Sequence, residues 1–188
     1  KINFSKKLIL KNITFKYPRD KDQLFKNLNL EIKKNEMIGI IGPSGEGKST
    51  LVKILLGLIE PISGIIKVDK KKIIQNQVER YQMLFGYLPQ QNLFIPDTIK
   101  ENIAFGKDNI DEKKVVEALI KTNCMEFVKK LKNNINYKLQ EDGKNFSSGQ
   151  LQRFALARIL YFNNDIIILD EPTSALDKKA EKKFIQLV

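Results

Sequence analysis

The chain has 188 residues, of which 42% are apolar and 29% charged, and its formal net charge is +11 at pH 7. This composition is that of a globular chain with a sizeable core, and it excludes collagen, coiled coil and intrinsic disorder. The densest apolar run, residues 51–59, contains Lys53 and is far shorter than the roughly 20 apolar residues that a membrane-spanning helix needs. The positive charge favours an anionic partner, but the lysines are spread along the whole chain, so charge alone is weak support.

The start of the chain and its cysteine content bear on where the protein works. Cys124 is the single cysteine, so no internal disulfide can form, which suits a reducing compartment. The chain begins at Lys1 without an apolar leader, so we expect no signal peptide and interpret the chain as a piece of a longer protein.

Strands and helices are predicted to alternate. Alternating or short continuous apolar runs predict strands over residues 8–15, 28–32, 37–41, 64–68, 84–88 and 166–169. Helical spacing and end signals, among them Asp111 and Gly57, predict helices over residues 49–58, 111–120, 125–131, 148–160 and from 178 onward. This alternation indicates an α/β fold with a largely parallel central sheet.

A glycine-rich loop lies between the third predicted strand and the first predicted helix. Residues 42–50 have the sequence GPSGEGKST and fit the phosphate-loop pattern G-x-x-x-x-G-K-[ST]. The glycines let successive N–H groups point at one anion, and the helix adds its positive end. Lys48 would reach the β- and γ-phosphates of a nucleotide, and the Ser49 hydroxyl would bind Mg²⁺. The residues expected to hold the nucleotide are Gly42, Ser44, Gly45, Gly47, Lys48, Ser49 and Thr50.

Two carboxylates, Asp170 and Glu171, follow the predicted buried strand 166–169. Ligands bind at this end of the strands in open α/β sheets. Asp170 would hold Mg²⁺ through water, and Glu171 would act as the catalytic base that polarises an attacking water. Without the phosphate loop, the same pair would equally suit a solvated strand end that caps the next helix.

Residues 146–150 have the sequence FSSGQ, residues 152–158 have QRFALAR, and residues 172–177 have PTSALD. Together with the loop and the Asp-Glu pair, these segments resemble the nucleotide-binding domain of an ATP-binding cassette (ABC) transporter, from about residue 13 to 177. The resemblance implies a P-loop NTPase of ABC type that is truncated at its C-terminus. Its core lobe, with a mixed sheet, would cover about residues 1–90 and 160–188, and its helical signature lobe about residues 91–159.

The resemblance also implies roles for single residues. Tyr17 would stack on adenine, and Gln90 would contact Mg²⁺ or the attacking water as a catalytic residue. Asp177 would link the two sites of a dimer. The signature residues Ser147, Gly149 and Gln150 would bind the γ-phosphate of an ATP held by a partner domain, so that two domains enclose two ATP molecules head to tail.

Residues 86–91 (GYLPQQ) and 97–106 (DTIKENIAFG), with Glu141 and Gly143, resemble the B-type exporter branch. This implies an ATPase that powers export at the cytoplasmic face of the inner or plasma membrane. Its partners would be a transmembrane domain, upstream of Lys1 or on a separate subunit, and a second nucleotide-binding domain in a homodimer, with no nucleic acid. The alternative is an ABC-type ATPase acting on nucleic acid or ribosomes, which +11 would suit. The segment between Gln90 and Ser147 is too short for the coiled coil of the DNA-acting members.

Three departures from the family pattern matter. Ser148 replaces the first glycine of the signature, and its Cβ would crowd the partner's phosphate if the backbone there needs a positive φ. Asn35 replaces a glycine in the turn before residues 37–41, and asparagine tolerates that conformation. The sequence contains no histidine, so the family's switch histidine is either absent from the protein or lies beyond these residues, and we expect these residues alone to bind ATP but hydrolyse it poorly.

Overall fold

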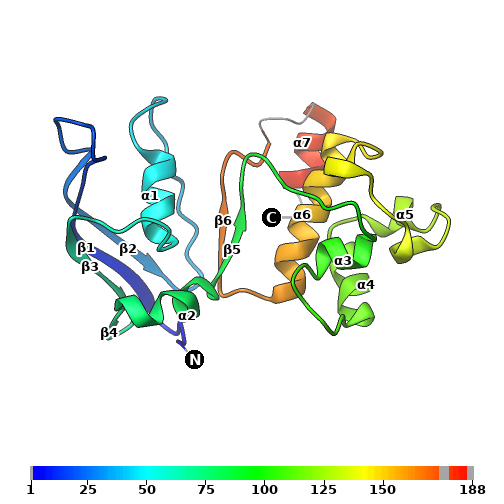
Figure 1. Ribbon diagram of the computed structural model, residues 1–188, viewed down its shortest axis with the longest axis horizontal. Helices are drawn as coiled ribbons and strands as arrows, with labels where there is room; N and C mark the ends of the chain where they lie inside the picture. Colours follow the sequence, from blue (N-terminus) through cyan, green and yellow to red (C-terminus); the bar gives the residue numbers. More distant parts are fainter. Residues whose placement is uncertain (1, 174–177, 186–188) are drawn as a thin grey trace. The chain divides into compact units, whose positions relative to one another are not determined.

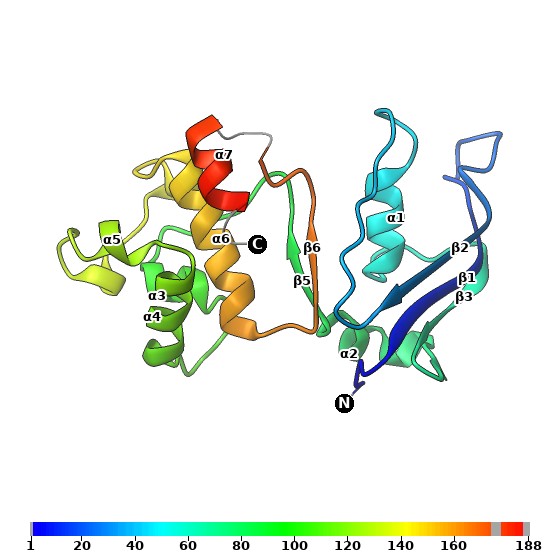
Figure 2. The same cartoon turned by 180° about the vertical axis from the view of Figure 1, so that it is seen from behind.

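The structure, a computed structural model, describes residues 2–173 and 178–185 (Figures 1 and 2). The chain forms two compact units, Lys1–Phe85 and Gly86–Val188. No helix in the described part of the chain is long and apolar enough to cross a membrane.

The first unit is built on an antiparallel sheet with the strand order β2-β1-β3-β4. Its strands are β1 (Lys7–Phe15), β2 (Phe25–Lys33), β3 (Ser63–Val68) and β4 (Lys71–Lys72). In β1 the side chains of Leu8, Leu10 and Ile13 are fully buried. The register shifts between Leu10 and Ile13, where Asn12 has a φ of 53°. Leu8 and Leu10 are buried before this bulge and Ile13 and Phe15 after it, so β1 keeps apolar residues in the core on both sides of the bulge.

Two helices, α1 (Lys48–Leu55) and α2 (Val78–Gln82), complete the first unit. The hydroxyl of the buried Tyr81 donates to the carbonyl of Leu55, which ties α2 to the end of α1. Gly57 follows α1 with a φ of 67°, and Asn35 has a φ of 62°, so both predicted turn residues adopt the left-handed conformation.

The second unit has a two-stranded sheet and a helical layer. Strands β5 (Phe85–Leu88) and β6 (Ile166–Leu169) lie side by side in both views (Figures 1 and 2). The helices are α3 (Ile99–Ile103), α4 (Glu112–Lys121), α5 (Met125–Val128), α6 (Ser148–Phe162) and α7 (Lys178–Ile185). Helix α6 packs against α3, α4 and α7. Its buried Phe154 and Ala157 belong to one apolar cluster with Val115 and Leu119 of α4.

Most predicted elements are confirmed, and two expectations, a strand over residues 37–41 and a buried strand 166–169, are wrong. Residues 37–41 form no strand: Met37 and Ile41 are exposed, and the segment pairs with no strand among the described residues. Every pairing in the four-stranded sheet is antiparallel, so parallel pairing is not found there. Strand β6 is half-buried, with Ile167 exposed, since β5 is its one neighbour in the described part of the sheet.

Candidate functional site

The phosphate loop surrounds the ammonium group of Lys48. Its Nζ donates to the carbonyl oxygens of Gly42 at 2.8 Å and of Pro43 at 2.7 Å. Gly47 caps α1 with a φ of 91°, and a Cβ there would lie 2.9 Å from Cζ of Phe25, so only glycine fits. The loop therefore presents a cation at the start of a helix.

The surroundings of this loop suit an anion. Gly42, Ser44, Gly45 and Ser49 are exposed, so a ligand can reach them from solvent. The first turn of α1 contains no acidic residue that would compete for its N–H groups. A helix N-terminus without such a competitor attracts phosphate.

Tyr17 lies beside the last residue of the loop. Its hydroxyl and that of Thr50 share a hydrogen bond of 2.8 Å. Its ring contacts Phe15 edge to face, with centroids 5.0 Å apart, and 38% of the residue is exposed. An aromatic ring that is fixed at one edge and partly open to solvent can stack on a base.

In the second unit, Asp170 is anchored through its backbone and its side chain. Its N–H donates to the carbonyl of Leu88 at 2.9 Å, and the hydroxyl of Tyr87 donates to Oδ2 of Asp170 at 3.1 Å. Burial, with a smaller contribution from Asp170, raises the pKa of Tyr87 to about 12. Tyr87 is therefore protonated at neutral pH and acts as a donor that orients the Asp170 carboxylate.

Gln90 and Glu171 are brought into contact. Nε2 of Gln90 donates to Oε2 of Glu171 at 3.1 Å, and both residues are exposed. Glu171 has a φ of 46°, a left-handed conformation that is unfavourable for a residue with a side chain and is typical of functional sites.

The FSSGQ segment forms the start of α6. The Ser147 hydroxyl accepts from the Gln150 N–H at 3.3 Å, and Oε1 of Gln150 accepts from the Ser147 N–H at 2.8 Å. This reciprocal cap leaves the Ser147 hydroxyl its own hydrogen to donate. Ser148 begins the helix with a negative φ, so the predicted conflict between its Cβ and a positive φ does not arise.

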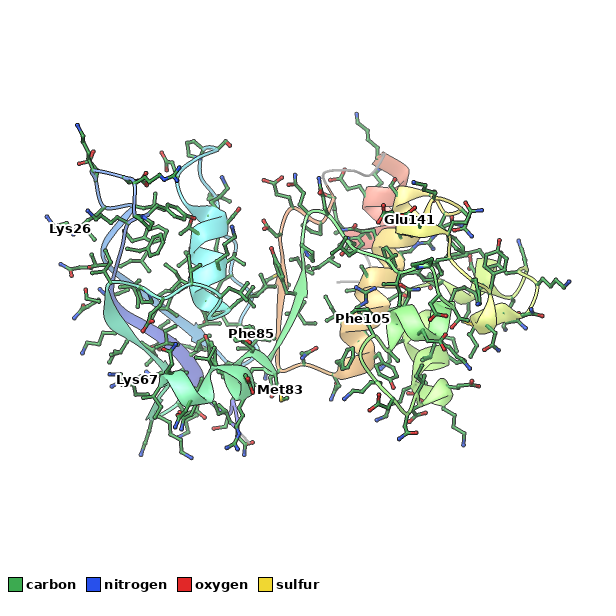
Figure 3. The ribbon with its side chains drawn as sticks, in the orientation of Figure 1. Lys26, Lys67, Met83, Phe85, Phe105 and Glu141 are labelled. Carbon is green, nitrogen blue, oxygen red and sulfur yellow. The ribbon has the colours of Figure 1, made fainter. Side chains whose placement is uncertain are left out.

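Glu141 and Gly143 lie in a 3₁₀ turn that precedes α6 (Figure 3). Glu141 is exposed, whereas Gly143 is buried with a φ of 68°. A Cβ at Gly143 would lie 2.5 Å from Cδ2 of Leu151. Glycine here allows the turn to pack against α6 while Glu141 faces solvent.

The donors expected for Mg²⁺ are the Ser49 hydroxyl, the Gln90 amide and the Asp170 carboxylate. These are hard oxygen ligands, which Mg²⁺ prefers. The described residues contain no cluster of three or more His, Cys, Asp or Glu side chains that could form a separate metal site. A set with so few carboxylates fits an ion that is held jointly with the phosphates of a nucleotide.

Predicted site residues thus meet in four contacts: Lys48 with Gly42, Tyr17 with Thr50, Gln90 with Glu171, and Ser147 with Gln150. The phosphate loop and Tyr17 belong to the first unit and the other described site residues to the second. Asp177 lies outside the described residues. Sequence reasoning assigned no role to Tyr87, although it lies in the GYLPQQ segment, because its contact with Asp170 depends on the pairing of β5 with β6.

Known proteins are similar to this chain over most of its length. The sequence matches the family described as ABC transporter over residues 25–174. ATP-binding cassette sub-family B member 5 of Mus musculus is 40% identical over 172 residues, which are 91% of this chain and 14% of that protein. A putative export ATP-binding/permease protein of Rickettsia bellii is 38% identical over 182 residues, 96% of this chain and 32% of that protein.

A solved structure, that of a bacterial Atm1-family ABC exporter with ATP bound, is similar with a TM-score of 0.86 and 31% sequence identity. The similarity covers 97% of this chain and 32% of that one. The chain therefore spans about a third or less of the length of these three relatives.

Proposed function

This chain belongs to the ABC transporter family, and from that premise we propose that it binds and hydrolyses ATP to power export by a membrane transporter. The observation that carries the hydrolytic part is the hydrogen bond between Gln90 and Glu171. It holds a carboxylate beside the loop glutamine at the end of β6, where a general base for water is required.

For binding, the proposal assigns the triphosphate to the loop 42–50. The Lys48 ammonium exchanges its contacts with the loop carbonyls for the β- and γ-phosphates, because a charge-assisted bond to phosphate is stronger than one to a neutral carbonyl. The Tyr17 ring stacks on adenine while its hydroxyl stays on Thr50. This arrangement places the nucleotide between a fixed ring and a fixed cation.

For hydrolysis, Ser49, Gln90 and Asp170 are the proposed Mg²⁺ ligands. The bound ion would neutralise charge on the phosphates. Tyr87 donates to Asp170 and thereby orients its carboxylate. Glu171 accepts a proton from the water that attacks the γ-phosphorus, the bond from that phosphorus to the β–γ bridging oxygen breaks, and ADP leaves. The amide of Gln90 fixes the orientation of Glu171.

For coupling, the start of α6 offers a second anion site. The Ser147 hydroxyl and the backbone around Gly149 would bind the γ-phosphate of ATP on a partner domain, and Asp177 would join the two sites. The exposed Glu141 and the loop after Gln90 would contact a transmembrane domain at the cytoplasmic face of the membrane. ATP would then close a head-to-tail dimer, and hydrolysis would open it.

Turnover and ATP affinity in two variants test this proposal. Glu171→Gln should lower kcat about 100-fold or more and leave ATP affinity within about twofold, because it removes the base and keeps the shape. Lys48→Ala should weaken ATP binding about tenfold or more.

Matched controls are Glu79→Gln on α2 and Lys53→Ala on α1, both at exposed positions, and both should behave as wild type. Wild-type turnover by the Glu171→Gln variant would disprove the role of the base. Unchanged ATP binding in Lys48→Ala would disprove the assignment of the loop.

A further inference from the structure

Gln152 is a buried polar residue on the second turn of α6, with 8% of its surface exposed. Its Nε2 donates to the carbonyl of Pro172 at 2.7 Å, and its Oε1 accepts from Nδ2 of Asn92 at 3.0 Å. Because the Pro172 carbonyl can only accept, the amide nitrogen must face it, and the amide oxygen is thereby directed to Asn92. Both ends of one side chain are engaged with two different loops.

These two loops carry the proposed catalytic pair. Pro172 directly follows Glu171, and Asn92 is two residues beyond Gln90. The pair is joined at its side chains by the bond from Gln90 to Glu171, and the same loops are joined again through Gln152. The three hydrogen bonds and the chain segments 90–92 and 171–172 together form a closed ring, so a shift of either loop strains or breaks one of these bonds.

These bonds restrain the unfavourable backbone conformation of Glu171. A φ of 46° at a residue with a side chain persists only where neighbouring contacts hold it. The bond from Gln152 restrains the peptide group immediately beyond Glu171–Pro172. A restraint from a packed helix is more rigid than one from a loop, and α6 packs against three other helices.

Helix α6 also begins with the FSSGQ segment. Gln152 lies one turn after Gly149, and Nε of its neighbour Arg153 donates to the Gly149 carbonyl at 3.2 Å. The helix that would bind the partner's γ-phosphate is therefore the helix that restrains the catalytic loops.

From this geometry we propose that Gln152 is a positioning residue for ATP hydrolysis: it holds the Gln90 and Glu171 loops on α6, so that the base keeps its orientation. This inference rests on the proposed function. Gln152 contacts neither the nucleotide nor the attacking water in this role. Its loss should impair turnover and loosen both loops without weakening ATP binding.

The test compares variants in the intact protein that contains these residues. Gln152→Leu removes both bonds and should lower kcat about tenfold or more, with KM for ATP within about twofold. Asn92→Ala removes one bond and should have a smaller effect of the same kind. The double variant should be no slower than Gln152→Leu, since the two residues share one connection.

A second readout needs no nucleotide. Amide hydrogen exchange over residues 88–92 and 170–173 should be faster in Gln152→Leu than in wild type. Thr122→Val is the matched control, because Thr122 is buried on the same unit and bonds only within its own turn, to Ala118, Leu119 and Cys124. It should leave kcat and exchange in these loops unchanged.

Wild-type kcat in both Gln152→Leu and Asn92→Ala would overturn the inference, as would an equal loss of kcat in Thr122→Val. A rise in KM that accounts for the whole loss would show a binding role instead. These results are distinguishable from a failure of the proposed function, in which wild type itself shows no turnover that depends on Glu171. The inference would fall with that result.

Discussion

The hydroxyl of Tyr17 is held by Thr50, while its ring stays partly exposed and can stack on a base. The bond to Thr50 links the ring to the phosphate loop, and the edge contact with Phe15 sets its tilt. The bond to Thr50 could not be predicted from the sequence, which places the two residues far apart. The family resemblance singled out Tyr17 as a base-stacking residue, and the structure shows which residues hold its side chain.

Two substitutions separate the ring from the hydroxyl. Tyr17→Ala should weaken ATP binding by about 1 kcal/mol or more, roughly fivefold, because base stacking is lost. Tyr17→Phe keeps the ring and should stay within about twofold of wild type. Isothermal titration calorimetry with ATP checks both values. Equal losses in the two variants would show that the hydroxyl, not the ring, supports binding.

At the scale of elements, features that depend only on residues close in the sequence, such as helix caps, were predictable. Asp111 caps α4 by accepting from the Lys114 N–H, as its place before an amphipathic segment indicates. The strand expected over residues 37–41 fails for a non-local reason. Apolar β-branched residues favour strands, but a strand also needs a neighbour to bond with, and no sequence pattern shows whether one is present.

The signature segment combines a helix cap with a proposed anion site, and Ser147 variants separate the two. Ser147→Asp keeps a capping oxygen and should leave thermal stability close to wild type. It also places a negative charge where the partner's phosphate would bind, so it should abolish ATP-dependent dimerisation. Ser147→Ala, which loses the cap, should cost about 1 kcal/mol of stability. Thermal melting and sedimentation measure these effects, and an ATP-driven dimer in Ser147→Asp would refute the anion site.

Asp69, in the turn between β3 and β4, is hydrogen-bonded to the chain at the start of β1. The Asp69 carboxylate accepts from the Ser5 hydroxyl at 2.7 Å and from three backbone N–H groups, those of Ser5, Lys6 and Lys7. The Ser5 hydroxyl, followed by the Lys7 N–H, holds the pKa of Asp69 well below its usual range. A depressed pKa in the folded state adds stability above the unfolded pKa, about 4, and this is lost as the pH falls further.

Asp69→Asn should therefore lower the free energy of unfolding at pH 7, and its difference from wild type should shrink below about pH 4. Urea unfolding at pH 7 and pH 3 checks this. Asp22→Asn, at an exposed loop position, is the control and should show no such pH-dependent difference. A difference that grows on acidification would contradict the assignment.

At the scale of the whole molecule, the order of motifs along the chain was enough to predict the family, which the match over residues 25–174 confirms. The exporter branch was predicted from short loop segments, and the relatives agree with it. The lobe boundaries near residues 90 and 160 and the weak turnover of these residues alone stay predictions. The Gln152 contacts were not predictable, since they join three segments that are distant in the sequence.

We expect MgATP to bring two copies of this chain together. Sedimentation velocity of the Glu171→Gln variant with and without MgATP tests it most directly, because bound ATP persists when the base is removed. We expect a monomer without nucleotide and a dimer with MgATP. A variant that binds ATP but stays monomeric at all concentrations would contradict it.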